Sequence, residues 1–181
     1  MAPAVALTGT PGTGKSRVAR ALGSGVRSIE VATLARHLGV ARRRGRGTIV
    51  DLPALVRRAR RSGALDGVDV VVGHLAHLLP VERAIVLRCH PVELRARLRR
   101  ARRGTAAERQ ENFVCEATDV VLLEALAAGV EVTEIDTTGR SVAAVARRVR
   151  SRLRRTGGPR PGTVDWLADP RVTAHLLDRG R

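Results

Sequence analysis

The stretch Gly9-Thr10-Pro11-Gly12-Thr13-Gly14-Lys15-Ser16 fits G-x-x-x-x-G-K-[ST], the pattern of a Walker A phosphate loop. An apolar run over residues 3–8 predicts a strand before it, and the apolar spacing over 15–23 predicts the helix that must follow it. The glycines let the backbone wrap so that its N–H groups point at phosphate oxygens. Lys15 can neutralise the β- and γ-phosphates, and the Ser16 hydroxyl can ligate Mg²⁺. The stretch therefore predicts a site for ATP or a similar nucleotide with Mg²⁺.

Lys15 is the only lysine in a chain with 33 basic Lys and Arg side chains. Everywhere else the basic residue is arginine. A single lysine in the one position that needs a compact ammonium group, rather than a planar guanidinium, supports the phosphate-loop interpretation.

Composition limits the class of protein. The chain has 181 residues, enough for one domain with a sizeable core, and its hydrophobic content is 44%. It contains no apolar run near the roughly 20 residues needed to cross a membrane, and no secretory signal at its start. Two cysteines, Cys89 and Cys115, make no disulfide framework. We therefore expect a cytoplasmic protein without a membrane partner.

The net charge of +16 leaves two interpretations open. It can reflect polyanionic partners, either nucleotides or RNA. It can equally reflect an arginine-rich solvated surface, because the arginines are spread over several expected helices. Aromatic residues are nearly absent, so a bound base would have to stack on arginine planes.

Strand and helix patterns alternate along the chain, which predicts an α/β fold with a parallel five-stranded sheet in three α/β/α layers. We expect Thr33, Asp51 and Ser141 to cap helices, and Arg42 to Gly47 to form a basic loop. Strands are expected over 3–8, 26–31, 68–72, 84–87 and 130–135, and helices over 15–23, 33–38, 52–62, 91–103, 108–128 and 141–155.

Ligands of such sheets bind beyond the carboxyl ends of the strands. The phosphate loop, His74, Arg88 and Asp136 all fall at expected strand ends. The domain is expected to span residues 1–155, and residues 156–181 are expected to be a linker and a tail that packs back or docks a partner.

Several stretches together resemble one family. They are LTGTPGTGKS (7–16), GHLAHLLP (73–80), VLRCHPVELRARL (86–98), and QENFVCEATDVVLLEA (110–125) with EIDTTGRS (134–141). On these residues the chain resembles the archaeal putative adenylate kinase family, relatives of eukaryotic adenylate kinase isoenzyme 6. The resemblance implies a P-loop, nucleoside monophosphate (NMP) kinase-like fold and a broad-specificity kinase that transfers the ATP γ-phosphate to an NMP, with AMP the first choice.

The resemblance also implies further roles. They are ATPase activity and small ribosomal subunit maturation, with a small-subunit ribosomal protein or pre-ribosomal particle, and rRNA, as partners. One alternative is an ATP-dependent ribosome assembly factor in which NMP kinase activity is incidental. Another is a P-loop kinase for a different small molecule, such as shikimate or dephospho-coenzyme A.

Site residues follow from the same resemblance. The nucleotide-binding set extends to Arg17, beside Gly9, Gly12, Thr13, Gly14, Lys15 and Ser16. An NMP-binding region of about 28–51 contributes Arg36, and a lid of about 102–110 contributes Arg102 or Arg103. Arg36 and Arg88 are candidates to hold the acceptor phosphate. The expected catalytic residues are Lys15, His74, Arg102 and Arg103.

The chain departs from the family pattern at Val72. The family carries D-x-H where this chain reads Val72-Gly73-His74, so the histidine is present and the carboxylate is missing. Asp69 cannot replace it, because the two-residue period of a strand points its side chain to the opposite face. Our hypothesis at this point is that Mg²⁺ is held less firmly here than in relatives.

Overall fold

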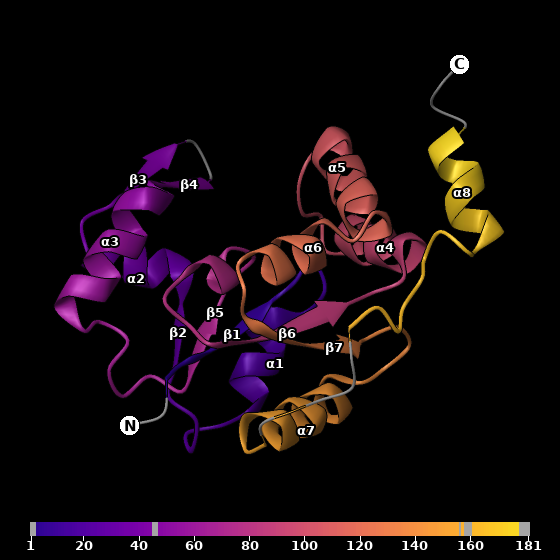
Figure 1. Cartoon of the computed structure of the whole chain (residues 1–181). Helices are drawn as coiled ribbons and strands as arrows, with labels where there is room; N and C mark the ends of the chain where they lie inside the picture. Colours follow the sequence, from indigo (N-terminus) through magenta and orange to yellow (C-terminus); the bar gives the residue numbers. More distant parts are fainter. Residues whose placement is uncertain (1–2, 45–46, 156, 158–160, 178–181) are drawn as a thin grey trace.

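The computed structural model describes residues 3–44, 47–155, 157 and 161–177. Its centre is a parallel five-stranded sheet with the order β2-β5-β1-β6-β7 (Figure 1). The strands of this sheet are β1 (Val5–Thr8), β2 (Ser28–Glu30), β5 (Val70–Val72), β6 (Arg83–Arg88) and β7 (Glu131–Asp136). The fold class and all five expected strands are confirmed.

Helices cover both faces of the sheet (Figure 1). They are α1 (Lys15–Ala21), α2 (Val31–His37), α3 (Leu52–Ser62), α4 (Pro91–Arg100), α5 (Ala106–Ala117), α6 (Val120–Ala127), α7 (Val142–Leu153) and α8 (Pro170–Leu177), with a 3-10 turn η1 (Ala76–Leu78). Among these described helices, none combines the length and the apolar composition that a membrane crossing requires.

Side chains of each strand alternate between two apolar cores, as the two-residue period dictates. One core contains Ala6, Val71 and Val86 and is covered by α2, α3 and α6. The other contains Leu7 and Val72 and is covered by α1 and α7. The β-branched runs are buried on both faces, which is why they appear in the sequence as continuous apolar stretches.

Two of the expected helix caps are confirmed and one is wrong. The side chain of Asp51 accepts from the Ala54 N–H at 3.0 Å, and that of Ser141 accepts from the Ala144 N–H at 3.2 Å. Thr33 is not a cap, because α2 begins at Val31 with Glu30 in the cap position. The chain passes directly from β2 into α2, so the strand end itself starts the helix.

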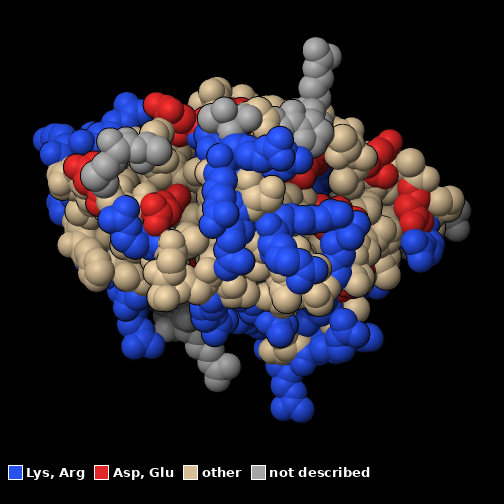
Figure 2. Space-filling model, turned by 90° about the horizontal axis from the view of Figure 1, so that it is seen from below, with Lys and Arg blue, Asp and Glu red and all other residues tan. Residues whose placement is uncertain are grey.

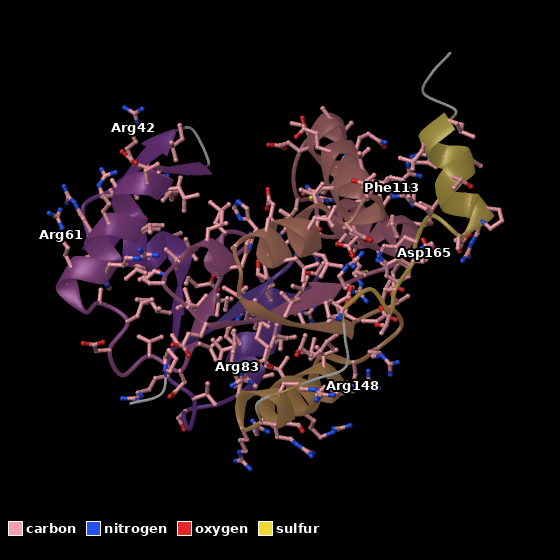
Figure 3. All side chains as sticks on the ribbon, in the orientation of Figure 1. Arg42, Arg61, Arg83, Phe113, Arg148 and Asp165 are labelled. Carbon is pink, nitrogen blue, oxygen red and sulfur yellow. The ribbon has the colours of Figure 1, made fainter. Side chains whose placement is uncertain are left out.

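The prediction of a loop over 42–47 is wrong for the described residues 42–44 and 47, which lie in strands. Strands β3 (Ala41–Arg44) and β4 (Gly47–Val50) pair antiparallel, with Ala41 opposite Val50. The β-branched run Thr48-Ile49-Val50 supplies the strand that the arginine run pairs with. The hairpin and α3 form a projecting arm, from which Arg42 and Arg61 point outward (Figure 3).

The expected single helix over 108–128 is two helices, α5 and α6. The break is at Asp119, which adopts a left-handed conformation with φ 59°. Its carboxylate makes an ion pair with Arg88. A long-range contact therefore interrupts a helical pattern that is continuous in the sequence.

The tail packs back onto the domain. Val172 of α8 is fully buried against Phe113 and Ala117 of α5 (Figure 3). The indole N–H of Trp166 donates to Glu116 Oε1 at 3.1 Å, and its ring lies edge-on to His90. The described part of the tail is thus attached to the helices on either side of the expected lid.

Candidate active site

The phosphate loop joins β1 to α1 at the carboxyl edge of the sheet. Gly9 has φ +133°, and a Cβ there would lie 2.3 Å from the Leu87 carbonyl oxygen of β6. Gly14 has φ +102°, and a Cβ there would meet nothing within 4 Å. Glycine is therefore required at this position by the backbone conformation rather than by lack of space. The loop is therefore shaped by its own sequence and by close approach to β6.

Lys15, at the start of α1, points back into the loop. Its Nζ donates to the carbonyl oxygens of Gly9 at 2.6 Å and Thr10 at 3.0 Å. Burial lowers the pKa of Lys15 to about 8, against smaller raising effects from the charges of Glu116 and Glu30. Because burial disfavours the ammonium form of Lys15, the negative charge of a bound phosphate would stabilise that form strongly.

A cleft of about 1040 Å³ opens over the loop. Its floor is the phosphate loop with the ends of β2 and β5, and its far wall is α4, the lid and α5. The charged and polar residues that line it include Lys15, Ser16, Arg17, Glu30, His74, Arg97, Arg100, Arg103, Asn112 and Arg140. This volume accommodates a nucleotide-sized ligand between a phosphate-binding loop and a row of arginines.

Comparisons with known proteins agree with this geometry. A family model described as an AAA domain matches residues 5–119. A protein named "Putative adenylate kinase" from Archaeoglobus fulgidus is 42% identical over 173 residues, covering 91% of this chain and 92% of that protein. Proteins of the same name are 35% identical in Thermococcus onnurineus, covering 96% and 97%, and 41% identical in Natronomonas pharaonis, covering 90% and 96%.

The chain belongs to this archaeal putative adenylate kinase family. It is a P-loop protein of the nucleotide-kinase type.

Two solved structures share the fold at low identity. The Deinococcus radiodurans tunicamycin resistance protein has a TM-score of 0.53 at 17% identity, covering 88% of this chain and all of that one. Shikimate kinase from Bacteroides thetaiotaomicron has a TM-score of 0.50 at 14% identity, covering 84% and 99%.

The structure brings most of the expected nucleotide-binding residues together. Of that set, Gly12, Thr13, Gly14, Lys15, Ser16, Arg17 and Arg103 line the cleft, as does His74 from the expected catalytic residues. Gly9 lies beneath it and accepts from Lys15. His74 is held at the edge of the sheet, where its carbonyl accepts from Thr8 Oγ1 at 3.0 Å.

The pKa of His74 lies below its ordinary value, because burial and then the charge of Lys15 both disfavour the imidazolium. Glu124 opposes this effect weakly. His74 is therefore a neutral imidazole at physiological pH, able to orient a water or a hydroxyl rather than to supply a fixed charge.

The two lid arginines separate in the structure. Arg103 is among the described residues that line the cleft, whereas Arg102 is not. Arg102 adopts a left-handed conformation with φ 49°, just beyond the C-terminal end of α4, and is exposed. The turn that ends α4 therefore directs one of two adjacent arginines toward the phosphate loop.

Arg88 does not sit as an acceptor-binding residue would. Its side chain is 2% exposed and pairs with Glu116 at 2.9 Å, with Glu134 at 2.6 Å and with Asp119. Burial lowers the pKa of Arg88, but the carboxylates of Glu116 and Asp119 raise it by more, so the net shift is upward. We correct the expectation: Arg88 is the centre of a buried ion cluster that holds the fold.

Arg36 does not line the cleft either. Its Nε donates to the Ala32 carbonyl at 3.3 Å and its guanidinium to Thr33 Oγ1 at 3.0 Å, both within α2. These are exposed, local contacts. A role for Arg36 in acceptor binding stays a prediction that requires α2 to move toward the cleft.

Several functional candidates were not found from the sequence. Arg97 and Arg100 of α4 lie one turn apart on the face toward the cleft, and Arg140 follows β7. Arg97 also donates to Thr137 Oγ1 at 3.1 Å and to the Thr137 carbonyl at 2.8 Å. The i, i+3 spacing of Arg97 and Arg100 was the available signal, but α4 has four arginines and so offers several such faces.

The chemistry of the donor set suits Mg²⁺. The Ser16 hydroxyl and the Glu30 carboxylate both line the cleft, and hard oxygen ligands are those that Mg²⁺ prefers. The described residues contain no group of three or more His, Cys, Asp or Glu side chains able to hold a metal. Phosphate oxygens and water would therefore have to supply most ligands, as is usual for Mg²⁺ with nucleotides.

The state of Lys15 can be measured directly, because selective isotope labelling of lysine gives a single side-chain signal. We expect an NMR titration of folded, nucleotide-free protein to show a midpoint at about 8, against 10.5 for an ordinary lysine. Added ADP should move the midpoint upward, because phosphate charge favours the ammonium form. The urea-unfolded chain is the control. A folded midpoint equal to the unfolded one would contradict the buried, loop-bonded arrangement.

Replacing Arg88 should destabilise the protein rather than weaken substrate binding selectively. Arg88→Met leaves Glu116 and Glu134 buried without their cation, which costs about 3–5 kcal/mol of unfolding free energy. Chemical denaturation followed by circular dichroism measures it, with the exposed Arg36→Met as the matched control, expected within about 0.5 kcal/mol of wild type. Equal stabilities for the two variants would refute the structural role.

Proposed function

We propose that the protein is a nucleoside monophosphate kinase that transfers the γ-phosphate of ATP to an NMP, with AMP as the first acceptor. The observation that carries this proposal is the cleft. It holds the Lys15–Ser16 phosphate loop on one side and Arg97, Arg100 and Arg103 on the other. Phosphoryl transfer needs positioned charge on both sides of the transferred group more than it needs covalent chemistry.

The donor half of the reaction belongs to the phosphate loop. Backbone N–H groups between Gly9 and Lys15 bind the phosphates, and Lys15 exchanges its carbonyl contacts for phosphate oxygens. When bound with the nucleotide, Mg²⁺ supplies charge neutralisation for the phosphates, with Ser16 as a protein ligand. Arg140 and Arg17, which lie in the same cleft, offer planar groups for a base in a chain almost without aromatics.

The acceptor half belongs to the proposed NMP-binding region 28–51, which contains α2, β3 and β4 and is followed by α3. Arg36 is the proposed phosphate ligand there, and residues 102–110 form the proposed lid within the domain 1–155. Closure of the lid carries Arg103 toward the transferring phosphate and excludes water from it. When no acceptor is present, the neutral His74 can orient a water instead, which would give ATPase activity.

A second candidate function is favoured by the distribution of charge. Seen from the side of α1 and α7, the surface carries many more basic than acidic side chains (Figure 2). On α7 and directly after it, four arginines are exposed, namely Arg147, Arg148, Arg154 and Arg155. A face of this kind binds a polyanion such as rRNA through its phosphates. It supports a factor that acts in small-subunit maturation on a pre-ribosomal particle or its protein, with NMP phosphorylation incidental.

A panel of acceptors separates these functions. ATP consumption is measured in a coupled assay with AMP, CMP, GMP and UMP, and with shikimate and dephospho-coenzyme A for the alternative small-molecule kinases. We expect NMPs to stimulate ADP formation, with AMP strongest. ATP hydrolysis that no NMP stimulates would overturn kinase activity as the main role and favour the assembly factor.

The two lid arginines provide a matched pair of variants. Arg103→Ala should lower kcat by about 100-fold or more, because an arginine that neutralises the transferring phosphate contributes at least that much. Arg102→Ala should stay within about threefold of wild type, since an exposed arginine away from the cleft contributes little. Steady-state kinetics with ATP and AMP decide. A larger loss for Arg102→Ala would reverse the assignment.

A further inference from the structure

The site lacks a carboxylate where P-loop enzymes usually have one. In P-loop NTPases the metal is held by the loop serine or threonine and by an aspartate at the end of a strand beside the loop strand. Here β5 is the neighbour of β1 and it ends at Val72, an apolar residue that is 1% exposed. Asp69 cannot help, because it is bonded to the Arg27 backbone N–H at 2.7 Å, before β5 begins.

The neighbouring strand carries a carboxylate at the same level. In the sheet register, Leu7 of β1 pairs with Val72 of β5, and Val72 pairs with Glu30 of β2. Registered residues of adjacent strands project to the same face of a sheet. Leu7 and Val72 both belong to the core beneath α1, so Glu30 projects to the face on which α1 carries Lys15 and Ser16.

The local backbone holds Glu30 close to this edge. A Cβ at Gly73 would lie 2.7 Å from Val31 Cγ2, so the start of α2 packs tightly on the end of β5. Glu30 occupies the cap position of α2 but makes no side-chain hydrogen bond to the helix. Its carboxylate lines the cleft with Ser16, Gly73 and His74, and its charge acts on Lys15.

The other carboxylates of the cleft are less suitable. Among the described residues that line it, Glu108 and Glu111 lie on α5, across the cleft from the sheet edge. Glu108 is also occupied, because it accepts from the Thr105 backbone N–H at 2.5 Å in a capping box. Glu116 is buried and bonded to Thr10, Arg88 and Trp166. Glu30 is the carboxylate that the fold places at the metal side of the phosphate loop.

We propose that Glu30 supplies the negative charge that helps Ser16 to hold the nucleotide-bound Mg²⁺, acting through the water shell of the metal, in place of the carboxylate that is missing at Val72. In this arrangement the end of β2, rather than the end of β5, provides the carboxylate. The inference rests on the proposed binding of ATP but not on the identity of the acceptor. It is the alternative to the hypothesis that Mg²⁺ is held less firmly here than in relatives.

The test measures how strongly the metal and the nucleotide support each other's binding. Isothermal titration gives the dissociation constant of ADP in excess EDTA and in saturating MgCl₂, and we define the ratio of the first to the second as the metal coupling. Glu30→Gln should lower the coupling by about tenfold, the lower end of the effect of removing an outer-shell metal partner. In EDTA its ADP affinity should equal or exceed that of wild type, because a negative charge near the phosphates is gone.

A control variant removes the same charge from the other wall of the cleft. Glu111 of α5 is exposed, as Glu30 is, and Glu111→Gln should keep the wild-type coupling. Electron paramagnetic resonance of Mn²⁺ titrated into the protein–ADP complex gives an independent readout. Mn²⁺ affinity should fall by about tenfold in Glu30→Gln and stay unchanged in Glu111→Gln.

Each outcome decides. Wild-type coupling in Glu30→Gln overturns the proposal, even if ADP binds more tightly in EDTA, since Glu30 would then act only as a counter-charge for Lys15. An equal loss in both variants also overturns it, since the effect would be general electrostatics. If the coupling depends on Glu30 but no NMP is phosphorylated, the inference holds and the proposed acceptor fails.

Discussion

The carboxylate of Glu116 is the contact on which the arrangement of this site depends. It is 2% exposed, and its two oxygens accept from four donors: Thr10 Oγ1 at 2.5 Å, Arg88 Nε at 2.9 Å, the Cys89 N–H at 3.0 Å and the Trp166 indole at 3.1 Å. These donors come from the phosphate loop, the end of β6 and the tail. A buried charge is tolerated only when it is satisfied in this way. The phosphate loop is thereby fixed to α5, the helix that leads out of the lid.

The ion cluster around Arg88 accounts for two features that lie far apart in the sequence, the helix break at Asp119 and the return of the tail. Arg88 needs more than one carboxylate to remain buried, and the helix break at Asp119 turns a third carboxylate toward it. Gly162 and Thr163 of the tail donate to the other oxygen of Glu134, whose first oxygen pairs with Arg88. The split of α5 from α6 and the return of the tail are therefore two ways of satisfying one buried ion cluster.

The sequence predicted what depends on local pattern. Five strands, the parallel sheet, the phosphate loop and the caps at Asp51 and Ser141 follow from periodicity and residue type within a short window. The hairpin of β3 and β4 was missed because its arginine strand has no alternation of its own and is recognised only with its partner. Arg88 was misassigned because its carboxylate partners lie 28, 31 and 46 residues away. Nothing in a linear pattern shows which arginine is solvated and which is buried.

The metal side of the site shows why motif positions are a limited guide to chemistry. In the sequence, Val72 stands at the position where a carboxylate is expected. Glu30 lies 42 positions earlier, directly before a helix, and no motif marks it. Pairing in the sheet makes the two residues neighbours on one face. A bound cation responds to the distance and direction of negative charge rather than to the strand that carries it. A parallel sheet aligns several strand ends along one edge, so an acid lost from one strand can be replaced from the next while the phosphate loop stays unchanged.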